Sequence, residues 1–201
     1  DLRGVRGLGY IERVNRGEQD TFIARQHQDG APWFDIKAIQ PNTMDPLYVV
    51  KFLEPGGPFH PAMGLDMGSE RNRREAIERA VASGGITLTP PISSANETVI
   101  QQLLMWPVYK SGSRPPISDE ERVQRFFGVI YAPLLPSELL SGMPDVNAGT
   151  VNAHVFDTTD GVSTLLFDSE LTTAELEFSA PALTQRDFSA SRVLKIGGRD
   201  L

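Results

Sequence analysis

Residues 63–91, MGLDMGSERNRREAIERAVASGGITLTPP, decide the fold. They contain a short apolar segment that ends at Asp66, then a charged segment, then a glycine pair before a threonine-rich run. Ser69 is expected to cap a helix that runs to about Ala82, because a serine oxygen accepts hydrogen bonds from the free N–H groups of a first helical turn. Gly84 is expected to end this helix, because glycine adopts the left-handed backbone without steric cost. The stretch therefore predicts a strand, a helix and a second strand in series.

The predicted helix is amphipathic. Its small and apolar residues fall on one face at helical spacing and are expected to be buried: Ala76, Ile77, Ala80 and Val81. Oppositely charged pairs at i,i+4 are expected on the solvent face: Glu70–Arg74, Arg71–Glu75 and Glu75–Arg79. Residues 86–89 then predict a short strand, which ends at the two prolines that follow.

Residues 1–28, which precede this stretch, predict one long helix. Apolar residues recur along it at helical spacing: Leu8, Ile11, Val14, Phe22 and Ile23. Asp29, Gly30 and Pro32 are expected to end the helix. An apolar stripe on a long helix indicates a parallel homodimer through two such helices, or packing of the helix on its own domain.

Strands are expected on both sides of a short helix at residues 136–142. The predicted strands are residues 33–39, 48–53, 100–109, 126–131, 150–157, 163–168, 174–179 and 192–196. We expect the strand at 126–131 to pair with the one before it, across a polar loop at 111–121. The chain is therefore predicted to be an α+β protein with two units in series behind one long helix.

Composition excludes several classes of function. The formal net charge is −7, so nucleic acid is not an expected partner. The chain has no cysteine, which excludes disulfides and thiolate metal sites. No apolar run approaches the roughly 20 residues of a membrane span. Because the chain starts at Asp1 without an initiator methionine or a signal peptide, we expect an excised fragment of a longer protein.

Motifs that carry catalysis are absent from the sequence. The three histidines, His27, His60 and His154, show no metal-ligand spacing at helical periodicity, so no metal site and no cofactor are expected. There is no Gly-rich phosphate loop before a helix, no G-x-S-x-G and no H-E-x-x-H. The acidic run Asp119-Glu120-Glu121 is typical of a solvated loop. No catalytic residue is expected, although a small hydrolase remains an alternative.

Several residues have two possible interpretations, one structural and one in ligand binding. Asp66 is either a turn aspartate that accepts hydrogen bonds from backbone N–H groups, or a carboxylate that faces a ligand with N–H donors. Thr87 and Thr89 belong either to an ordinary half-exposed strand or to the lining of a cavity. The same choice, core or pocket, applies to the aromatic residues Trp33, Trp106, Tyr109 and Tyr131.

An ordered set of segments adds a family resemblance. The segments are Gly9-Tyr10, Arg13-Val14, Phe22, Arg25-Gln26, Gly64-Leu65-Asp66, Arg74-Glu75-Ala76-Ile77, Ala80, Gly84, Leu88-Thr89, Trp106-Pro107-Val108-Tyr109-Lys110 and Gly128. From about Gly7 onward, the chain resembles the CHASE domain. This is the extracellular sensor of plant cytokinin-receptor histidine kinases and of many bacterial histidine kinases, nucleotide cyclases and cyclic-di-GMP enzymes.

The resemblance implies an architecture and a location. A stalk helix (1–31) would precede a membrane-distal PAS-like unit (32–135), followed by a linker helix and a membrane-proximal PAS-like unit (136–201), with antiparallel sheets. Transmembrane helices would flank the domain outside this chain. The chain would then be a periplasmic sensor of a bacterial inner-membrane protein, dimeric through the stalk, whose output is a histidine kinase or a diguanylate cyclase.

The resemblance also implies a ligand site in the distal unit. Asp66 matches the aspartate that holds the adenine ring of cytokinin, and Leu88 matches a leucine that contributes a backbone contact. Tyr131 and Ala132 fall near small residues of the family's pocket, where Tyr131 is bulkier and favours another small organic ligand. Thr87, Thr89 and Trp106 complete the expected ligand-binding set. A dimerising protein-interaction module without a small ligand is the alternative.

Overall fold

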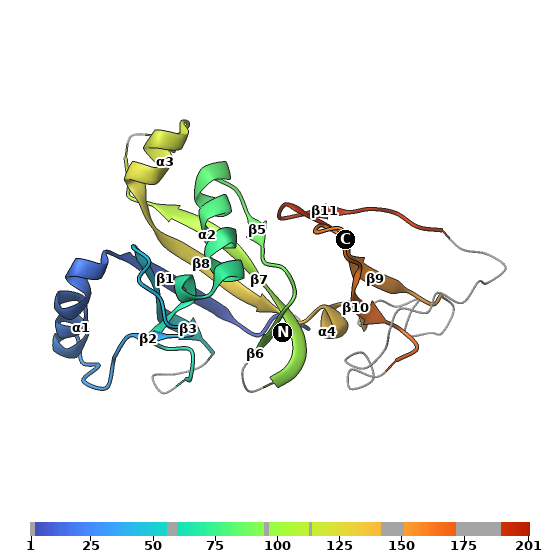
Figure 1. Ribbon diagram of the computed structural model, residues 1–201, viewed down its shortest axis with the longest axis horizontal. Helices are drawn as coiled ribbons and strands as arrows, with labels where there is room; N and C mark the ends of the chain where they lie inside the picture. The colour runs from blue at the N-terminus through green and yellow to red at the C-terminus, as the bar shows by residue number, and fades with distance from the viewer. Residues whose placement is uncertain (1–2, 56–59, 95–96, 113, 142–150, 172–189) are drawn as a thin grey trace. The chain divides into compact units, whose positions relative to one another are not determined.

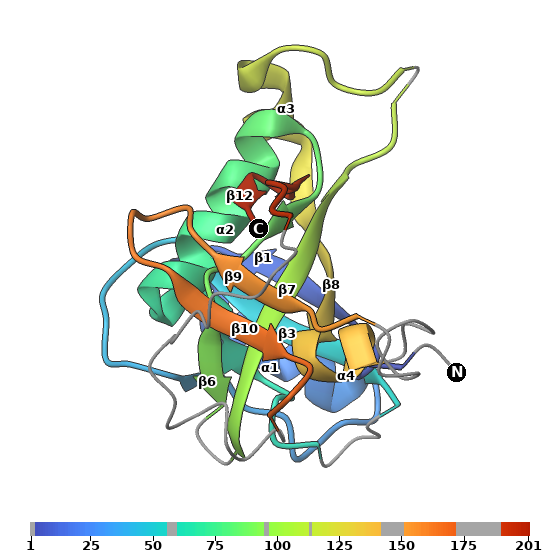
Figure 2. The same ribbon diagram turned by 90° about the vertical axis from the view of Figure 1, so that its right-hand side faces the viewer.

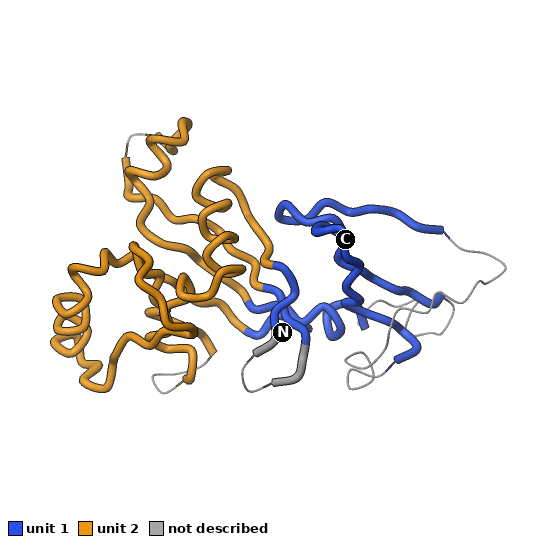
Figure 3. Tube along the Cα trace, viewed as in Figure 1, with its two compact units in different colours: residues 1–6, 90–102, 133–201 blue, residues 7–89, 103–132 orange. Residues whose placement is uncertain are grey.

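The computed structural model describes residues 3–55, 60–94, 97–112, 114–141, 151–171 and 190–201 (Figure 1). The chain is an α+β protein, as predicted, and it divides into two compact units (Figure 3). Unit 1 comprises Asp1–Arg6, Pro90–Gln102 and Pro133–Leu201, and unit 2 comprises Gly7–Thr89 and Leu103–Ala132. No helix in the described ranges is both long enough and apolar enough to span a membrane.

One mixed sheet contains most of the strands. They are β1 (Leu8–Val14), β2 (Lys37–Ala38), β3 (Leu47–Glu54), β4 (Leu65–Asp66), β5 (Thr87–Leu88), β6 (Ile92–Ser94), β7 (Glu97–Tyr109) and β8 (Phe126–Leu134). The strand order is β2-β4-β3-β1-β8-β7-β5, and β6 pairs with β7. The predicted pairing of the strand at 126–131 with its predecessor is confirmed. An entirely antiparallel sheet is not observed, because β2 and β4 run parallel.

The long N-terminal helix is a wrong prediction. Leu8–Val14 forms strand β1, followed by the 3-10 helix η1 (Arg16–Glu18) and the helix α1 (Gln19–Gln28). β1 lies between β3 and β8 and is antiparallel to both, so pairing on two sides outweighs the helical spacing of its apolar residues. Gly7 adopts a φ of 142°, and a Cβ there would lie 2.5 Å from the Glu54 carbonyl oxygen. The homodimer was expected to form through an apolar stripe on one long N-terminal helix. Residues 8–28 do not form such a helix, so this argument for a dimer is lost.

Helix α2 (Arg71–Ser83) confirms the centre of the opening stretch and corrects its start. Ala76, Ile77, Ala80 and Val81 are buried as predicted, and Gly84 ends the helix with a φ of 70°. The N-cap is Glu70, whose carboxylate accepts hydrogen bonds from Asn72 N and Arg73 N. Ser69 belongs instead to the 3-10 helix η2 (Met67–Ser69), where its hydroxyl oxygen accepts a hydrogen bond from Ile39 N.

The charged residues of α2 are arranged differently from the prediction. Of the three expected i,i+4 pairs, Arg71–Glu75 is present. Arg74 is buried and pairs with Glu78, four residues further along, because its guanidinium turns toward β3 and η2. Arg79 donates a hydrogen bond to the carbonyl oxygen of Leu88. Arg74 and Arg79, both expected in ion pairs on the solvent face, therefore donate to neighbouring backbone carbonyls.

The region predicted as a polar loop contains the helix α3 (Asp119–Arg125). Ser118 is its N-cap and accepts a hydrogen bond from Glu121 N at 3.2 Å. The acidic run Asp119-Glu120-Glu121 forms the first turn, where negative charge is favoured by the helix dipole. The acidic run, with Ser118 directly before it, is therefore the start of a helix and not part of a loop.

An apolar cluster and a set of hydrogen bonds attach the helices of unit 2 to its sheet. Val14, Phe22, Phe34, Leu47 and Val49 form one cluster, which joins α1 to β1 and β3. α2 is tied to the sheet by polar contacts to its backbone: Thr87 Oγ1 donates to Ala76 O, and the Tyr109 hydroxyl donates to Val81 O. Figure 1 shows α2 lying along the strands. The sheet is therefore covered at two places by helices.

Unit 1 contains α4 (Pro136–Ser141), β9 (His154–Asp157), β10 (Thr164–Asp168), β11 (Lys195–Ile196) and β12 (Arg199–Asp200). β9 and β10 form an antiparallel hairpin, which faces the viewer in Figure 2. The short helix and the strands predicted at 150–157, 163–168 and 192–196 are present, in part with fewer residues. The strand predicted at 174–179 lies outside the described residues.

Candidate functional site

Asp66 is the last residue of β4 and is 1% exposed. Its Oδ1 accepts hydrogen bonds from Tyr48 N at 2.9 Å and from Gly68 N at 3.0 Å. These bonds cap η2 and tie β4 to β3, while Oδ2 takes part in neither. Among the described residues, no lysine or arginine forms an ion pair with Asp66. The carboxylate is thus held by neutral donors.

Arg74 fixes the backbone around Asp66. Its Nε donates to Gly68 O at 2.7 Å and its Nη2 donates to Pro46 O at 2.8 Å. The guanidinium lies 4.9 Å from the ring centroid of Tyr48, a cation–π contact, and burial chiefly raises the pKa of Tyr48 to about 12. A Cβ at Gly68 would lie 2.4 Å from the Tyr48 ring, so glycine is required there. The segment that carries Asp66 is therefore rigidly positioned.

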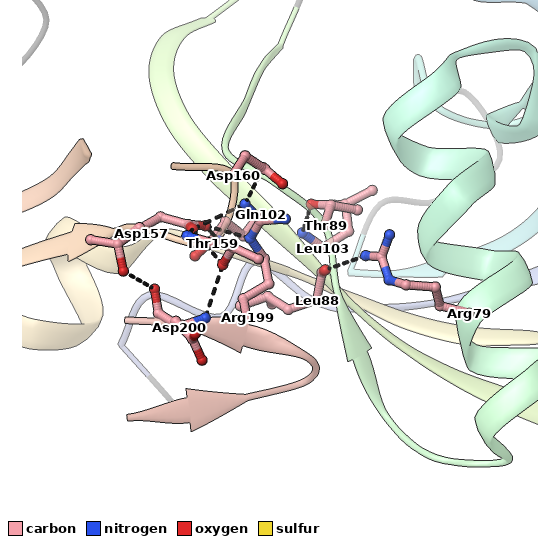
Figure 4. A network of polar contacts seen from close by, with 11 residues as sticks. Arg79, Leu88, Thr89, Gln102, Leu103, Asp157, Thr159, Asp160, Arg199 and Asp200 are labelled. Carbon is pink, nitrogen blue, oxygen red and sulfur yellow. Dashed lines mark hydrogen bonds and ion pairs between the residues drawn. The ribbon is translucent and has the colours of Figure 1, made fainter. Parts of the chain in front are cut away.

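The predicted β5 residues are buried and hydrogen-bonded. Thr87 Oγ1 donates to Ala76 O at 2.8 Å, and Thr89 Oγ1 accepts from Leu103 N at 2.9 Å. The carbonyl of Leu88, expected to contact a ligand, accepts from Arg79 Nη2 at 3.1 Å (Figure 4). A carbonyl oxygen has two lone pairs, so Leu88 retains capacity for one more donor.

Tyr131 is 2% exposed, and its hydroxyl has no hydrogen-bond partner among the described residues. Its ring lies over Gly9, its register partner on β1, where a Cβ would lie 2.1 Å from Cε1. Burial raises the pKa of Tyr131, because the phenolate would be desolvated. Ala132 follows it and is buried, whereas Trp106 on β7 is 58% exposed. Gly9 thus makes room for a buried phenol whose hydroxyl no described residue satisfies.

The strand order decides which predicted residues lie together. Thr87 and Leu88 pair with Met105 and Leu104 of β7, next to β8, which carries Tyr131 and Ala132. Between β4 and β5 lie four strands, β3, β1, β8 and β7. No hydrogen bond in the described part of the chain joins Asp66 to the other six candidates. The candidates therefore form two groups, one at Asp66 and one around β5 and β8.

A buried ion pair in unit 1 was not predicted from the sequence. Asp157 accepts two hydrogen bonds from Arg199, one on each carboxylate oxygen, and these side chains are among the most buried charged ones (Figure 4). Gln102 Nε2 donates to Asp157 Oδ2 at 3.3 Å, and Asp160 also pairs with Arg199. Asp157 and Arg199 are 42 positions apart in the sequence, so no local sequence pattern predicts their ion pair.

The comparison with protein families confirms the resemblance drawn from the sequence. The model of the CHASE domain matches residues 1–167, which include all of unit 2 and unit 1 as far as β10. No curated protein matches the chain significantly.

Proposed function

We propose that this chain, which belongs to the CHASE domain family, binds a small organic molecule in unit 2 and passes the signal across a membrane. CHASE domains are extracytoplasmic sensor domains of signalling proteins, and a sensor domain is not a catalytic one. The ligand, the PAS-like character of the two units, the membrane anchor and the attached output, a histidine kinase or a diguanylate cyclase, are parts of this proposal.

The observation that carries ligand binding is the buried Tyr131 hydroxyl without a described partner. Leaving a buried polar group unpaired costs about 1–3 kcal/mol, so such groups are rare and call for an explanation. A bound molecule with a hydrogen-bonding group opposite the phenol would recover that free energy. We place the ligand beside Tyr131 and Ala132 of β8, with Thr87, Leu88 and Thr89 at β5, on the other side of β7.

Asp66 supplies the proposed selectivity for N–H donors. Its carboxylate is buried, accepts hydrogen bonds from two backbone amides and forms no ion pair in the described part of the chain. A ligand that donates to Oδ2, as an aminopurine does, would be favoured over an analogue without the donor, because the charge would otherwise stay incompletely paired. Since β3 and β1 lie between β4, which carries Asp66, and β8, which carries Tyr131, the two residues are proposed as separate contacts.

The proposed signal route follows two strands. β7 and β8 both continue from unit 2 into unit 1, and Ala132 is the last residue of β8 in unit 2. A ligand that binds one arrangement of these strands more tightly would shift the population toward it. Displacement at Tyr131 would then reach unit 1 through one continuous backbone.

The test is a thermal-shift screen of adenine and N6-substituted adenines, amino acids and organic acids on the 201-residue chain. A ligand at about 100 times its Kd adds about 2.7 kcal/mol, which raises the Tm by roughly 5–10 °C at this size. Tyr131→Phe removes only the hydroxyl, and Asp66→Asn removes only the charge. Both are expected to reduce the shift, with Phe127→Leu as the exposed control. No stabilising compound in any class, or equal shifts in all variants, would contradict the proposal.

A dimerising module without a small ligand is the second candidate, and one observation favours it. Around the Tyr10 ring, unit 2 exposes the apolar residues Leu8, Phe52, Phe127 and Ile130. Exposed apolar patches on soluble domains often mark contact surfaces. Light scattering of the chain and of a Phe52→Ser variant distinguishes the candidates: a dimer that Phe52→Ser dissociates supports the module.

A further inference from the structure

One imidazole and two carboxylates meet on the β9–β10 hairpin of unit 1. His154 begins β9 and Asp168 ends β10, and the two are register partners across the hairpin. Glu170 follows two residues after Asp168. One ligand atom from each of the three side chains lies within 4.8 Å of the other two. This cluster is separate from the candidate ligand residues of unit 2.

The local backbone aims these side chains at one point. Facing residues of an antiparallel pair carry their side chains on the same face, which places His154 beside Asp168. Asp168 Oδ1 accepts a hydrogen bond from Glu170 N at 2.8 Å, and this turn brings Glu170 back toward the hairpin. The preceding residues Leu165, Leu166 and Phe167 are buried and anchor β10. The positions of the three donors are thus set by register, a turn and the core.

The contact between His154 and Asp168 is not a normal hydrogen bond. His154 Nδ1 and Asp168 Oδ2 are 3.4 Å apart, whereas N–H···O bonds are usually 2.7–3.2 Å long. In a tetrahedral site with donors at about 2.1 Å from the ion, neighbouring donors are about 3.4 Å apart. The separation already present between these two atoms is therefore that of two ligands of one ion, and a carboxylate oxygen of Glu170 lies within 4.8 Å of a ligand atom of each.

We propose that His154, Asp168 and Glu170 bind a divalent transition-metal ion, with Zn²⁺ as the best fit and water in the fourth position. One imidazole nitrogen and two carboxylate oxygens suit zinc, whose sites combine these ligands. The imidazole disfavours Ca²⁺ and Mg²⁺, which take oxygen ligands, and the absence of sulfur disfavours Cu(I). The ion would also neutralise two neighbouring carboxylates at the end of the hairpin.

This site goes beyond the proposed sensing of an organic ligand, and it does not depend on it. A metal ion at the hairpin would make the stability of unit 1 respond to extracytoplasmic zinc. His154 and Asp168 are 14 positions apart, Asp168 and Glu170 are 2 apart, and the three meet through the hairpin register and not through helical spacing. Register is set by pairing, so spacing alone could not reveal the site.

Isothermal titration of ZnCl₂ into the full 201-residue chain, free of any affinity tag and dialysed against chelator, tests the proposal. One Zn²⁺ per chain is expected. His154→Ala and Asp168→Asn should each weaken binding by about tenfold or more, since even groups that only support a ligand contribute 10–100-fold. Asp168→Asn keeps a side-chain oxygen that can accept the hydrogen bond from Glu170 N, so the turn is expected to be retained. His60→Ala is the matched control and should bind like the parent chain.

Three results would overturn the site: no zinc binding, equal loss in His60→Ala, or unchanged binding in His154→Ala. CaCl₂ and MgCl₂ are titrated in parallel, and binding of either as tight as that of zinc would exclude an imidazole-containing site. A second readout needs no variant. Zinc should shift the imidazole nitrogen resonances of one of the three histidines in NMR spectra, and the assignment of that histidine to His27 or His60 would also refute the proposal.

Discussion

Two buried aspartates, Asp66 in unit 2 and Asp157 in unit 1, are stabilised in different ways. Asp66 accepts hydrogen bonds from two backbone N–H groups, those of Tyr48 and Gly68. Asp157 accepts from the guanidinium of Arg199 on both oxygens, and from Gln102 and Thr159. Their side chains are equally inaccessible, so burial does not distinguish them.

The difference concerns charge. Amide donors satisfy hydrogen-bonding capacity and leave the negative charge uncompensated, whereas a bidentate guanidinium neutralises it. Burial by itself would raise the pKa of Asp157, but the bonds from Arg199 and Thr159 outweigh burial and hold that pKa below its ordinary value. Asp157 is therefore paired with a cation, whereas Asp66 accepts hydrogen bonds from backbone amides and forms no ion pair within the described ranges.

The largest expected effect follows from removing the cation. Arg199→Ala leaves Asp157 buried without a counter-charge, which should cost about 3–5 kcal/mol of unfolding free energy. Urea denaturation followed by circular dichroism measures this loss. Lys195→Ala is the control, because Lys195 forms an exposed pair with Asp200 that is worth at most about 1 kcal/mol. Equal losses in the two variants would show that the Asp157–Arg199 pair is not a distinct buried element.

A smaller effect is expected at Asp66. Asp66→Ala leaves the N–H groups of Tyr48 and Gly68 unpaired. The free energy of unfolding should fall by about 1–3 kcal/mol, the cost of one unsatisfied buried group. Asp66→Asn keeps an acceptor oxygen and should therefore lose less unfolding free energy than Asp66→Ala. The ligand-induced Tm shift should differ from this pattern, because both variants are expected to reduce it. The same urea titration gives the stability. A loss in Asp66→Asn as large as in Asp66→Ala would mean that the charge, and not the acceptor, stabilises the fold.

Local signals in the sequence were sufficient for α2. Its apolar positions and the glycine at 84 belong to the helix itself, and both predictions are confirmed. β1 was mistaken for helix because Leu8, Ile11 and Val14 fit helical spacing, while the pairing with β3 and β8 that decides its conformation comes from residues 33 or more positions away. Propensity and spacing are weak where tertiary pairing competes with them.

For the candidate site, the family resemblance suggested Asp66, Leu88 and Tyr131 as ligand contacts, which stays a prediction, and the surroundings of these residues could not be predicted. Arg74 was expected on the solvent face from its position in a charge pair, yet it holds the backbone beside Asp66. Likewise, the void that receives the Tyr131 ring depends on Gly9, a residue on another strand. Contacts of this kind depend on which strands are neighbours, and one sequence does not state the strand order.

The smallest expected effect is the dependence of stability on acid. The pKa of Asp157 is lowered in the folded chain, so its contribution is fully present above the ordinary value of 3.8 and is lost as the pH falls through the folded pKa. Below about pH 4, the parent chain should therefore lose free energy of unfolding more steeply than Asp157→Asn. The loss should be smaller than in Arg199→Ala, because protonation leaves the carboxyl group uncharged and still able to accept hydrogen bonds from Arg199. Urea midpoints measured between pH 2 and pH 5, the range about that ordinary pKa, give the two slopes. Parallel slopes would show that Arg199 does not lower the pKa of Asp157, and the contrast with Asp66 would then rest on geometry alone.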